Sequence, residues 1–167
     1  MKDSFTQVIR LGLWIVALAV GLYAADAFIF APGRLPACVQ DRLPEGRVCL
    51  ETVLKAYQDK QTPGRYRIVW VDARSESDYE LHHLMLNEDR VFPIRPGEDK
   101  QQLLDAAIER LIEADSRGEC IVVFCTADCT TSSDIARELK DLGLISAPIY
   151  VLEGGWPALK RSALVSD

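Results

Sequence analysis

The sequence has few cysteines, no basic stripe and no internal repeat, and each of these absences excludes a class of protein. Five cysteines in 167 residues are too few for a disulfide-rich scaffold, and their odd number leaves at least one thiol unpaired within a monomer. The formal net charge of −6, with no run of Lys and Arg among aromatic residues, argues against a nucleic-acid-binding surface. The hydrophobic content of 49% fills one core, so we expect one globular domain.

The longest uncharged run lies near the N-terminus, after a flank of residues 1–10. It begins at Leu11, is interrupted by Asp26 and continues to Ala31. About 20 apolar residues cross a bilayer as a helix, so we interpret residues 11–31 as a transmembrane anchor. A cleavable signal peptide, cut at Ala25-Asp26-Ala27, is the alternative interpretation. A buried core helix fits less well, because the segment is apolar all round.

The charges around this segment indicate which side of a membrane carries the rest of the chain. Lys2 and Arg10 precede the apolar run, which favours export of the domain to a periplasmic or extracellular side. Three arginines soon after the run leave the cytoplasmic face as an alternative, and signal cleavage would give a secreted protein. Cys38 and Cys49 could close a small disulfide loop in an oxidising compartment, or they could remain free thiols.

After a linker over residues 32–47, the globular domain is expected to cover residues 48–167. Short apolar runs typical of buried parallel strands occur at residues 68–71, 121–124 and 148–152. Pro93 restricts a further apolar run, residues 91–94, to a sheet edge or an irregular segment.

Segments with helical spacing of apolar residues separate these runs. They are residues 50–57, a short acidic stretch that ends at Tyr79, residues 99–114 and the segment from Ile135 to Gly143. Alternation of strands and helices predicts an α/β fold with a central parallel sheet that is covered on both faces.

Chemically notable segments follow three of the predicted strands. They are Asp72-Ala73-Arg74, the loop that opens with Cys125, and Glu153-Gly154-Gly155-Trp156. In an open parallel sheet, ligands bind outside the carboxyl ends of the strands, so we expect these segments to meet at one edge. The helix after the loop directs its first N–H groups at Cys125, which should lower the pKa of the thiol. The sequence therefore predicts a sulfur nucleophile that can carry a persulfide among backbone N–H donors.

In the order and spacing of these motifs, residues 48–159 resemble the rhodanese-like (sulfurtransferase) family. Residues 70–74, followed by Tyr79 and His83, are similar to the family's D-x-R…F/Y-x-x-G-H stretch. Residues 122–125 are similar to the strand that delivers the catalytic cysteine, and residues 151–156 to the closing G-G motif. The resemblance implies a three-layer α/β/α domain and a sulfurtransferase of the thiosulfate:cyanide type, with Cys125 as the catalytic residue.

The loop after Cys125 departs from the family's usual C-x-x-G-x-R-S. It lacks the glycine and the arginine, so an anionic donor such as thiosulfate loses its expected cationic partner. Asp128 adds a carboxylate that opposes both ionisation of the thiol and binding of an anion. Thr126 and Ala127 complete the first part of the loop. Hydroxyl groups that could bind the sulfur or an acceptor, one of them as the helix cap, belong to Thr130, Thr131, Ser132 and Ser133.

Cys129 gives the loop a second thiol. It could resolve a persulfide or mixed disulfide on Cys125, or it could be a small buried side chain at the helix start. Two thiolates alone do not make a zinc or copper site, so neither a metal nor a cofactor is expected.

Two further residues of the family stretch have structural interpretations. His83 is expected to be a hydrogen-bonded structural residue. Arg74 is expected to form an ion pair with Asp72 or Asp128 rather than to contact substrate.

Three functions are compatible with these residues. The first is a membrane-tethered protein that transfers sulfane sulfur through Cys125, with a small sulfur donor or acceptor, or a protein thiol, as partner. The second is a non-catalytic rhodanese-like binding module at a membrane. The third is a thioredoxin-like redox protein that uses Cys125 and Cys129, which would require a cis Ala147–Pro148 bond facing the cysteines. No nucleic acid partner is expected, and the sequence does not indicate an oligomeric state.

Overall fold

The computed structural model describes residues 38–82, 90–97, 99–127, 130–162 and 164–165. In this part of the chain five strands form one sheet in the order β1-β5-β4-β2-β3, and every neighbouring pair is parallel. The strands are β1 (Arg47–Val48), β2 (Ile68–Asp72), β3 (Val91–Pro93), β4 (Cys120–Phe124) and β5 (Ile149–Leu152). The predicted α/β fold with a central parallel sheet is therefore confirmed.

The burial of the two central strands, β2 and β4, explains why their sequences are continuous apolar runs. Every residue of β2 and β4 is buried, since both faces of the sheet are covered. The strand that contains Pro93 lies at the sheet edge, where the missing N–H of proline costs no ladder hydrogen bond.

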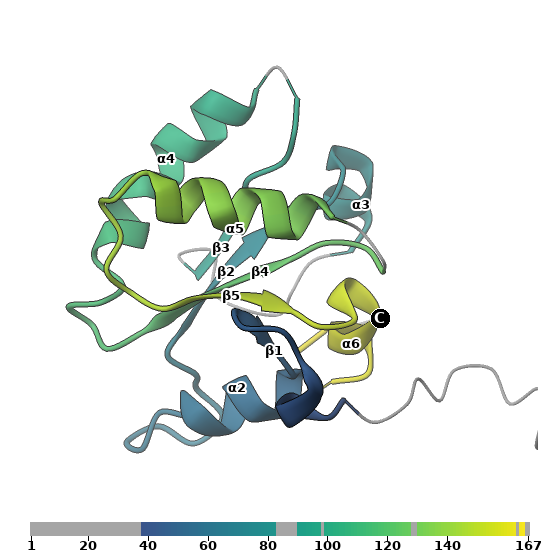
Figure 1. Ribbon diagram of the computed structural model, residues 1–167, viewed down its shortest axis with the longest axis vertical. Helices are drawn as coiled ribbons and strands as arrows, with labels where there is room; N and C mark the ends of the chain where they lie inside the picture. Colours follow the sequence, from purple (N-terminus) through teal and green to yellow (C-terminus); the bar gives the residue numbers. More distant parts are fainter. Residues whose placement is uncertain (1–37, 83–89, 98, 128–129, 163, 166–167) are drawn as a thin grey trace, which may run out of the picture. The chain divides into compact units, whose positions relative to one another are not determined.

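Helices cover both faces of the sheet, and Figure 1 shows α4 and α5 on one side of it and α2 and α6 on the other. The helical elements are η1 (Gln40–Arg42), α2 (Leu50–Ala56), α3 (Glu76–Leu81), α4 (Lys100–Ile112), α5 (Thr131–Asp141) and α6 (Gly155–Lys160). Each face has its own apolar cluster. One cluster joins the α4 and α5 side chains to Val71 and Val123, and the other joins α2 and α6 to Trp70 and Phe124.

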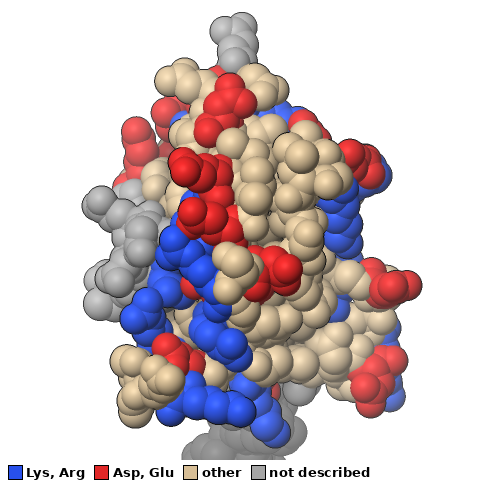
Figure 2. Space-filling view, turned by 90° about the vertical axis from the view of Figure 1, so that its left-hand side faces the viewer, with Lys and Arg blue, Asp and Glu red and all other residues tan. Residues whose placement is uncertain are grey.

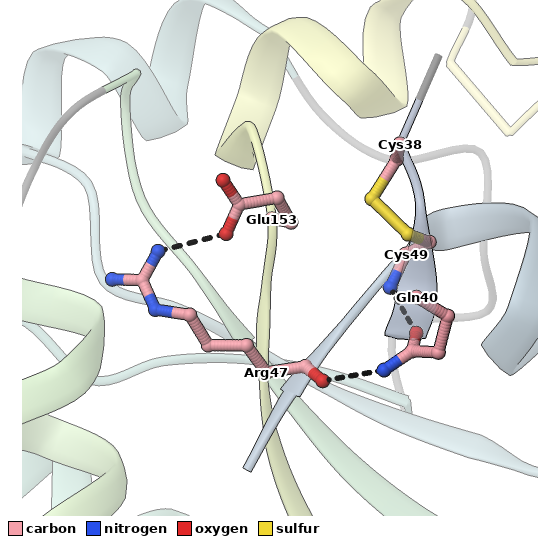
Figure 3. The surroundings of a disulfide bond; sticks show 5 residues. All are labelled: Cys38, Gln40, Arg47, Cys49 and Glu153. Atoms are coloured by element: carbon pink, nitrogen blue, oxygen red, sulfur yellow. Dashed lines mark hydrogen bonds and ion pairs between the residues drawn. A yellow bond between two sulfur atoms is a disulfide. The ribbon is translucent and has the colours of Figure 1, made fainter. Parts of the chain in front are cut away.

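The compact unit begins earlier than the sequence indicated, at Cys38 rather than Val48. Residues 38–47, assigned to the linker, contain η1 and the first residue of β1, which pairs with β5 at the sheet edge. A disulfide joins Cys38 to Cys49 and closes this segment on itself (Figure 3). A strand of two residues carries no periodic pattern, which is why the sequence did not reveal it.

The predicted anchor, residues 11–31, lies outside the described residues. Among the residues that the structure does describe, no helix combines the length and apolar character needed to cross a bilayer.

Candidate functional site

The strand order places a topological switch point between the carboxyl ends of β2 and β4, and we refer to this region as the crevice. After β2 the chain turns to β3 on one side, whereas after β4 it turns to β5 on the other side. The two connections diverge, and such a switch point is where open parallel sheets bind ligands. Asp72-Ala73-Arg74 follows one strand and Cys125 the other, so the expected meeting of these segments is observed.

Cys125 is the first residue after β4, and it lies at this crevice. It is only 4% exposed, and its thiol donates a hydrogen bond to the carbonyl oxygen of Ala73, with Sγ 3.5 Å from that oxygen. Sγ also lies 3.7 Å from Oγ1 of Thr126. Thr126 and Ala127 are exposed. The sulfur is therefore recessed beneath the start of its own loop.

The two glycines after β5 bring a third segment against Cys125. Gly154 and Gly155 both have positive φ, +73° and +48°. A Cβ on Gly155 would lie 2.3 Å from the carbonyl oxygen of Cys125 and 2.9 Å from that of Thr126. This close approach lets the N–H of Trp156 donate to the Cys125 carbonyl at 2.7 Å. The backbone position of Cys125 thus depends on the absence of a side chain at residue 155.

Arg74 stabilises the crevice from within. Its side chain forms an ion pair with Asp72 at 2.6 Å, and both side chains are at most 2% exposed. The guanidinium donates to the carbonyl oxygen of His82 at 2.8 Å and lies 3.7 Å from the centroid of the Trp156 ring. The predicted pair with Asp72 is confirmed, whereas the other predicted partner, Asp128, lies outside the described residues. The Arg74 side chain is buried and its charge is paired with the Asp72 carboxylate.

The sequence did not reveal an aromatic stack behind the strand ends. The His82 ring stacks on Trp156, with centroids 6.1 Å apart, and Phe124 stacks on Trp156 at the same separation. The family pattern directed attention to His83 instead, and that residue lies outside the described part of the chain. No sequence period links residues 82, 124 and 156, because they come from three separate elements.

The loop itself is described only at its two ends, since Asp128 and Cys129 lie outside the described residues. The helix α5 begins at Thr131, and the prediction that a hydroxyl group caps it is wrong for the N-cap residue, Thr130. Thr130 has helical backbone angles, whereas a capping side chain normally needs an extended backbone. Ser132 is buried in the first turn of the helix, and Thr131 is half-buried.

A cation near the loop comes from β1, where the sequence had placed a linker. Nη1 of Arg47 lies 2.8 Å from Oε2 of Glu153, and Nη2 lies 3.4 Å from the hydroxyl oxygen of Ser133 in the first turn of α5. Figure 3 shows the Arg47 side chain extended toward Glu153. The sequence analysis missed this arginine because it placed Arg47 in a linker and did not identify β1 as a strand.

A further buried cysteine, Cys120, stands at the opposite end of β4. Burial raises the pKa of its thiol to about 12, with a weaker contribution from the charge of Glu119. Cys120 is therefore a protonated core side chain at neutral pH, and it provides an internal comparison for Cys125.

The thioredoxin-like interpretation is not supported by the geometry. The described residues contain no cis peptide bond, so Ala147–Pro148 is trans. Pro148 accepts a hydrogen bond from the N–H of Ile121 at 2.8 Å, which puts it at the amino end of β4, away from Cys125. The proline therefore does not face the nucleophile.

A cavity of about 530 Å³ also lies at the amino end of β5, lined by residues that include Lys140, Pro148 and Tyr150. Figure 2 views the side on which β4 and β5 begin, and acidic and basic side chains are interspersed there. No predicted site residue lines this cavity, and parallel sheets bind ligands at their other edge. We therefore assign the candidate site to the Cys125 crevice.

Comparisons with known proteins concern the domain as a whole. The model of the Rhodanese-like domain matches residues 52–162. A solved structure that is similar is the N-terminal domain of a Clostridium difficile 630 protein named for ATP/GTP binding. It is 21% identical, covers 69% of this chain and 96% of its own, and superposes with a TM-score of 0.46. No curated protein matches the chain.

Proposed function

Since the chain belongs to the rhodanese-like domain family, we propose that it transfers sulfane sulfur through a persulfide on Cys125. The observation that carries the proposal is the position of this thiol. Cys125 directly follows a buried central strand at the switch point of the sheet, and α5 begins six residues later with Thr131. The first N–H groups of a helix stabilise an anion near its N-terminus, and a persulfide is such an anion.

The transfer consists of two displacements that need no external oxidant or reductant. In the first, the Cys125 thiolate attacks the outer sulfur of a donor. The bond between this sulfur and the rest of the donor breaks, and its electron pair leaves with the rest of the donor. With thiosulfate, the leaving group is sulfite and the product is Cys125–S–S⁻. In the second, the thiolate of an acceptor, or cyanide, attacks the outer sulfur of the Cys125 persulfide. This restores the Cys125 thiolate and gives a persulfide on the acceptor, or thiocyanate.

The described surroundings of Cys125 include a group that can hold a sulfur anion. Among the contacts of its side chain, the Ala73 carbonyl oxygen accepts from the thiol, and the Thr126 hydroxyl lies close enough to donate to the sulfur. The Cys125 carbonyl in turn accepts from the N–H of Trp156, which fixes the backbone at this residue. A hydroxyl donor of this kind stabilises an anion without a proton transfer.

We also propose that the domain is held at a membrane by residues 11–31 and faces the exported side. The disulfide between Cys38 and Cys49 supports that side, because such bonds persist in oxidising compartments. The partners would be a small sulfur donor and a small or protein thiol acceptor.

The test loads the full-length protein with thiosulfate and measures the mass of the intact chain and the sulfur released by cyanide. We expect the parent protein to gain one sulfur atom and Cys125→Ser to gain none. Cys120→Ala is the matched control, because its thiol lies at the other end of the same strand, and it should load like the parent.

Equal cyanide-released sulfur from the parent and Cys125→Ser would contradict the proposal. If neither protein carries a persulfide, and capture of a partner is unaffected by Cys125→Ser, the domain is a binding module instead.

A further inference from the structure

Three arginines of the described chain lie near the carboxyl edge of the sheet, and they differ in how their charge is used. Arg74 is buried and paired with Asp72. Arg95 is 11% exposed and contacts two carboxylates, Glu76 and Asp99, each at 3.1 Å. Arg47 contacts one carboxylate and one hydroxyl group. Among these three, Arg47 has the charge least compensated by protein groups.

The side chain of Arg47 points to the face of the sheet that carries Cys125. Arg47 pairs with Val151 in the parallel register, so the two side chains lie on the same face. Val151 belongs to the apolar cluster that also contains Cys125 and the inner side chains of α5. One strand, β5, separates β1 from β4, which puts the Arg47 backbone about 10 Å from β4.

The long side chain spans most of that distance. Its guanidinium reaches the hydroxyl of Ser133, and the N–H of Ser133 in turn bonds to the carbonyl of Thr130, at the end of the Cys125 loop. The positive charge therefore lies at the first turn of α5, the helix that follows the Cys125 loop.

The contact with Glu153 is weak enough for a ligand to replace. The Arg47 side chain is 37% exposed and that of Glu153 is 35% exposed, so water screens the pair. Exposed pairs of this kind contribute little to stability. The backbone of Arg47 is held more firmly, because the Gln40 side chain donates to its carbonyl at 3.0 Å and accepts from the N–H of Cys49 at 2.9 Å (Figure 3).

We propose that Arg47 determines specificity for anionic sulfur donors, by binding the sulfonate end of a thiosulfate-class donor while Cys125 attacks the outer sulfur. Glu153 holds the guanidinium in place without a donor and competes with the donor for it. In the reaction the sulfur–sulfur bond of the donor breaks, and the electron pair leaves with sulfite. This inference rests on the proposed sulfur transfer and assigns to it a residue that selects the donor.

The experiment compares two donors that give the same persulfide on Cys125. Loading of the full-length protein is followed by mass spectrometry, with thiosulfate as the anionic donor and cysteamine persulfide as a donor with a cationic tail. We expect Arg47→Gln to raise the thiosulfate concentration for half-maximal loading rate about two- to fivefold, the scale of one exposed charge interaction. Arg47→Lys should give a smaller rise, and Glu153→Gln should lower that concentration.

With cysteamine persulfide, Arg47→Gln should load at least as well as the parent. Added salt should reduce the difference between parent and variant with thiosulfate, because the interaction is between exposed charges. The inference would be overturned if Arg47→Gln changed the half-maximal concentration equally for both donors. It would also be overturned if neither Arg47→Gln nor Glu153→Gln changed that concentration for thiosulfate. If neither donor loads the parent, the proposed function itself fails.

Discussion

The contact between the two glycines and Cys125 gives the sharpest prediction, for the variant Gly155→Ala. The left-handed backbone of residue 155, with φ of +48°, costs an alanine about 1 kcal/mol. Its Cβ would also lie 2.3 Å from the Cys125 carbonyl oxygen, a backbone atom that cannot rotate away. The segments that contain residue 155 and Cys125 must therefore separate by about 1 Å to reach van der Waals distance.

That separation breaks the hydrogen bond from the N–H of Trp156 to the Cys125 carbonyl, and an unpaired buried group costs about 1–3 kcal/mol. In total we expect Gly155→Ala to lower the free energy of unfolding by about 2–4 kcal/mol. For a domain of this size, that corresponds to a fall of about 10 °C in the melting temperature.

The control is Gly143→Ala, which isolates the backbone term. Gly143 also has a positive φ, +66°, but no atom lies within 4 Å of its added Cβ. It should therefore lose only about 1 kcal/mol. Thermal and denaturant unfolding measure the stability of both variants, and persulfide loading should fall in Gly155→Ala alone. Equal losses of stability in the two variants would refute the close approach to Cys125.

Two further predictions concern the other described cysteines. Replacing Cys38 and Cys49 by serine should lower the free energy of unfolding by about 2–3 kcal/mol, the chain-entropy value for a loop with this separation of 11 residues. Dithiothreitol should lower the free energy of unfolding of the parent protein by a similar amount and leave that of the variant unchanged. No change in the stability of the parent on addition of dithiothreitol would contradict this prediction. Because burial raises the pKa of Cys120 to about 12, the unfolded chain releases this proton from about pH 9 while the folded chain keeps it. Stability should therefore fall between pH 9 and 12, by up to about 1.4 kcal/mol per pH unit from this group, and Cys120→Ala should remove that part of the slope. An unchanged slope in Cys120→Ala would show that the thiol is not responsible.

The central strands and the order of the segments at their ends were predictable, because burial on both faces leaves a continuous apolar run. β2 and β4 illustrate this, and so does the position of Cys125 immediately after β4. Contacts between distant segments were not predictable in the same way. Nothing local to Gly155 indicates that its missing side chain makes room for the Cys125 carbonyl, and β1 is too short for any period to mark it.

The sequence also left two acidic partners open for Arg74, and the reason is physical. An arginine after a parallel strand can pair with any carboxylate at the same edge, and the choice depends on which one is buried with it. Asp72 precedes Arg74 by two residues, and it accepts from both the Arg74 backbone N–H and the guanidinium. That geometry arises from the turn after β2, which residue types alone do not specify.

Two of the arginines near this edge, Arg74 and Arg47, have different roles: the buried one gives rigidity and the exposed one gives selectivity. A buried pair such as Asp72 with Arg74 must recover a large desolvation cost through close geometry, so it fixes the surrounding backbone and cannot rearrange for a ligand. An exposed arginine such as Arg47 contributes little to stability, is screened by salt and can exchange one anion for another. A change in the buried pair should therefore affect loading by every donor, because it disturbs the stack under Trp156. A change at Arg47 should affect only the donors that carry negative charge.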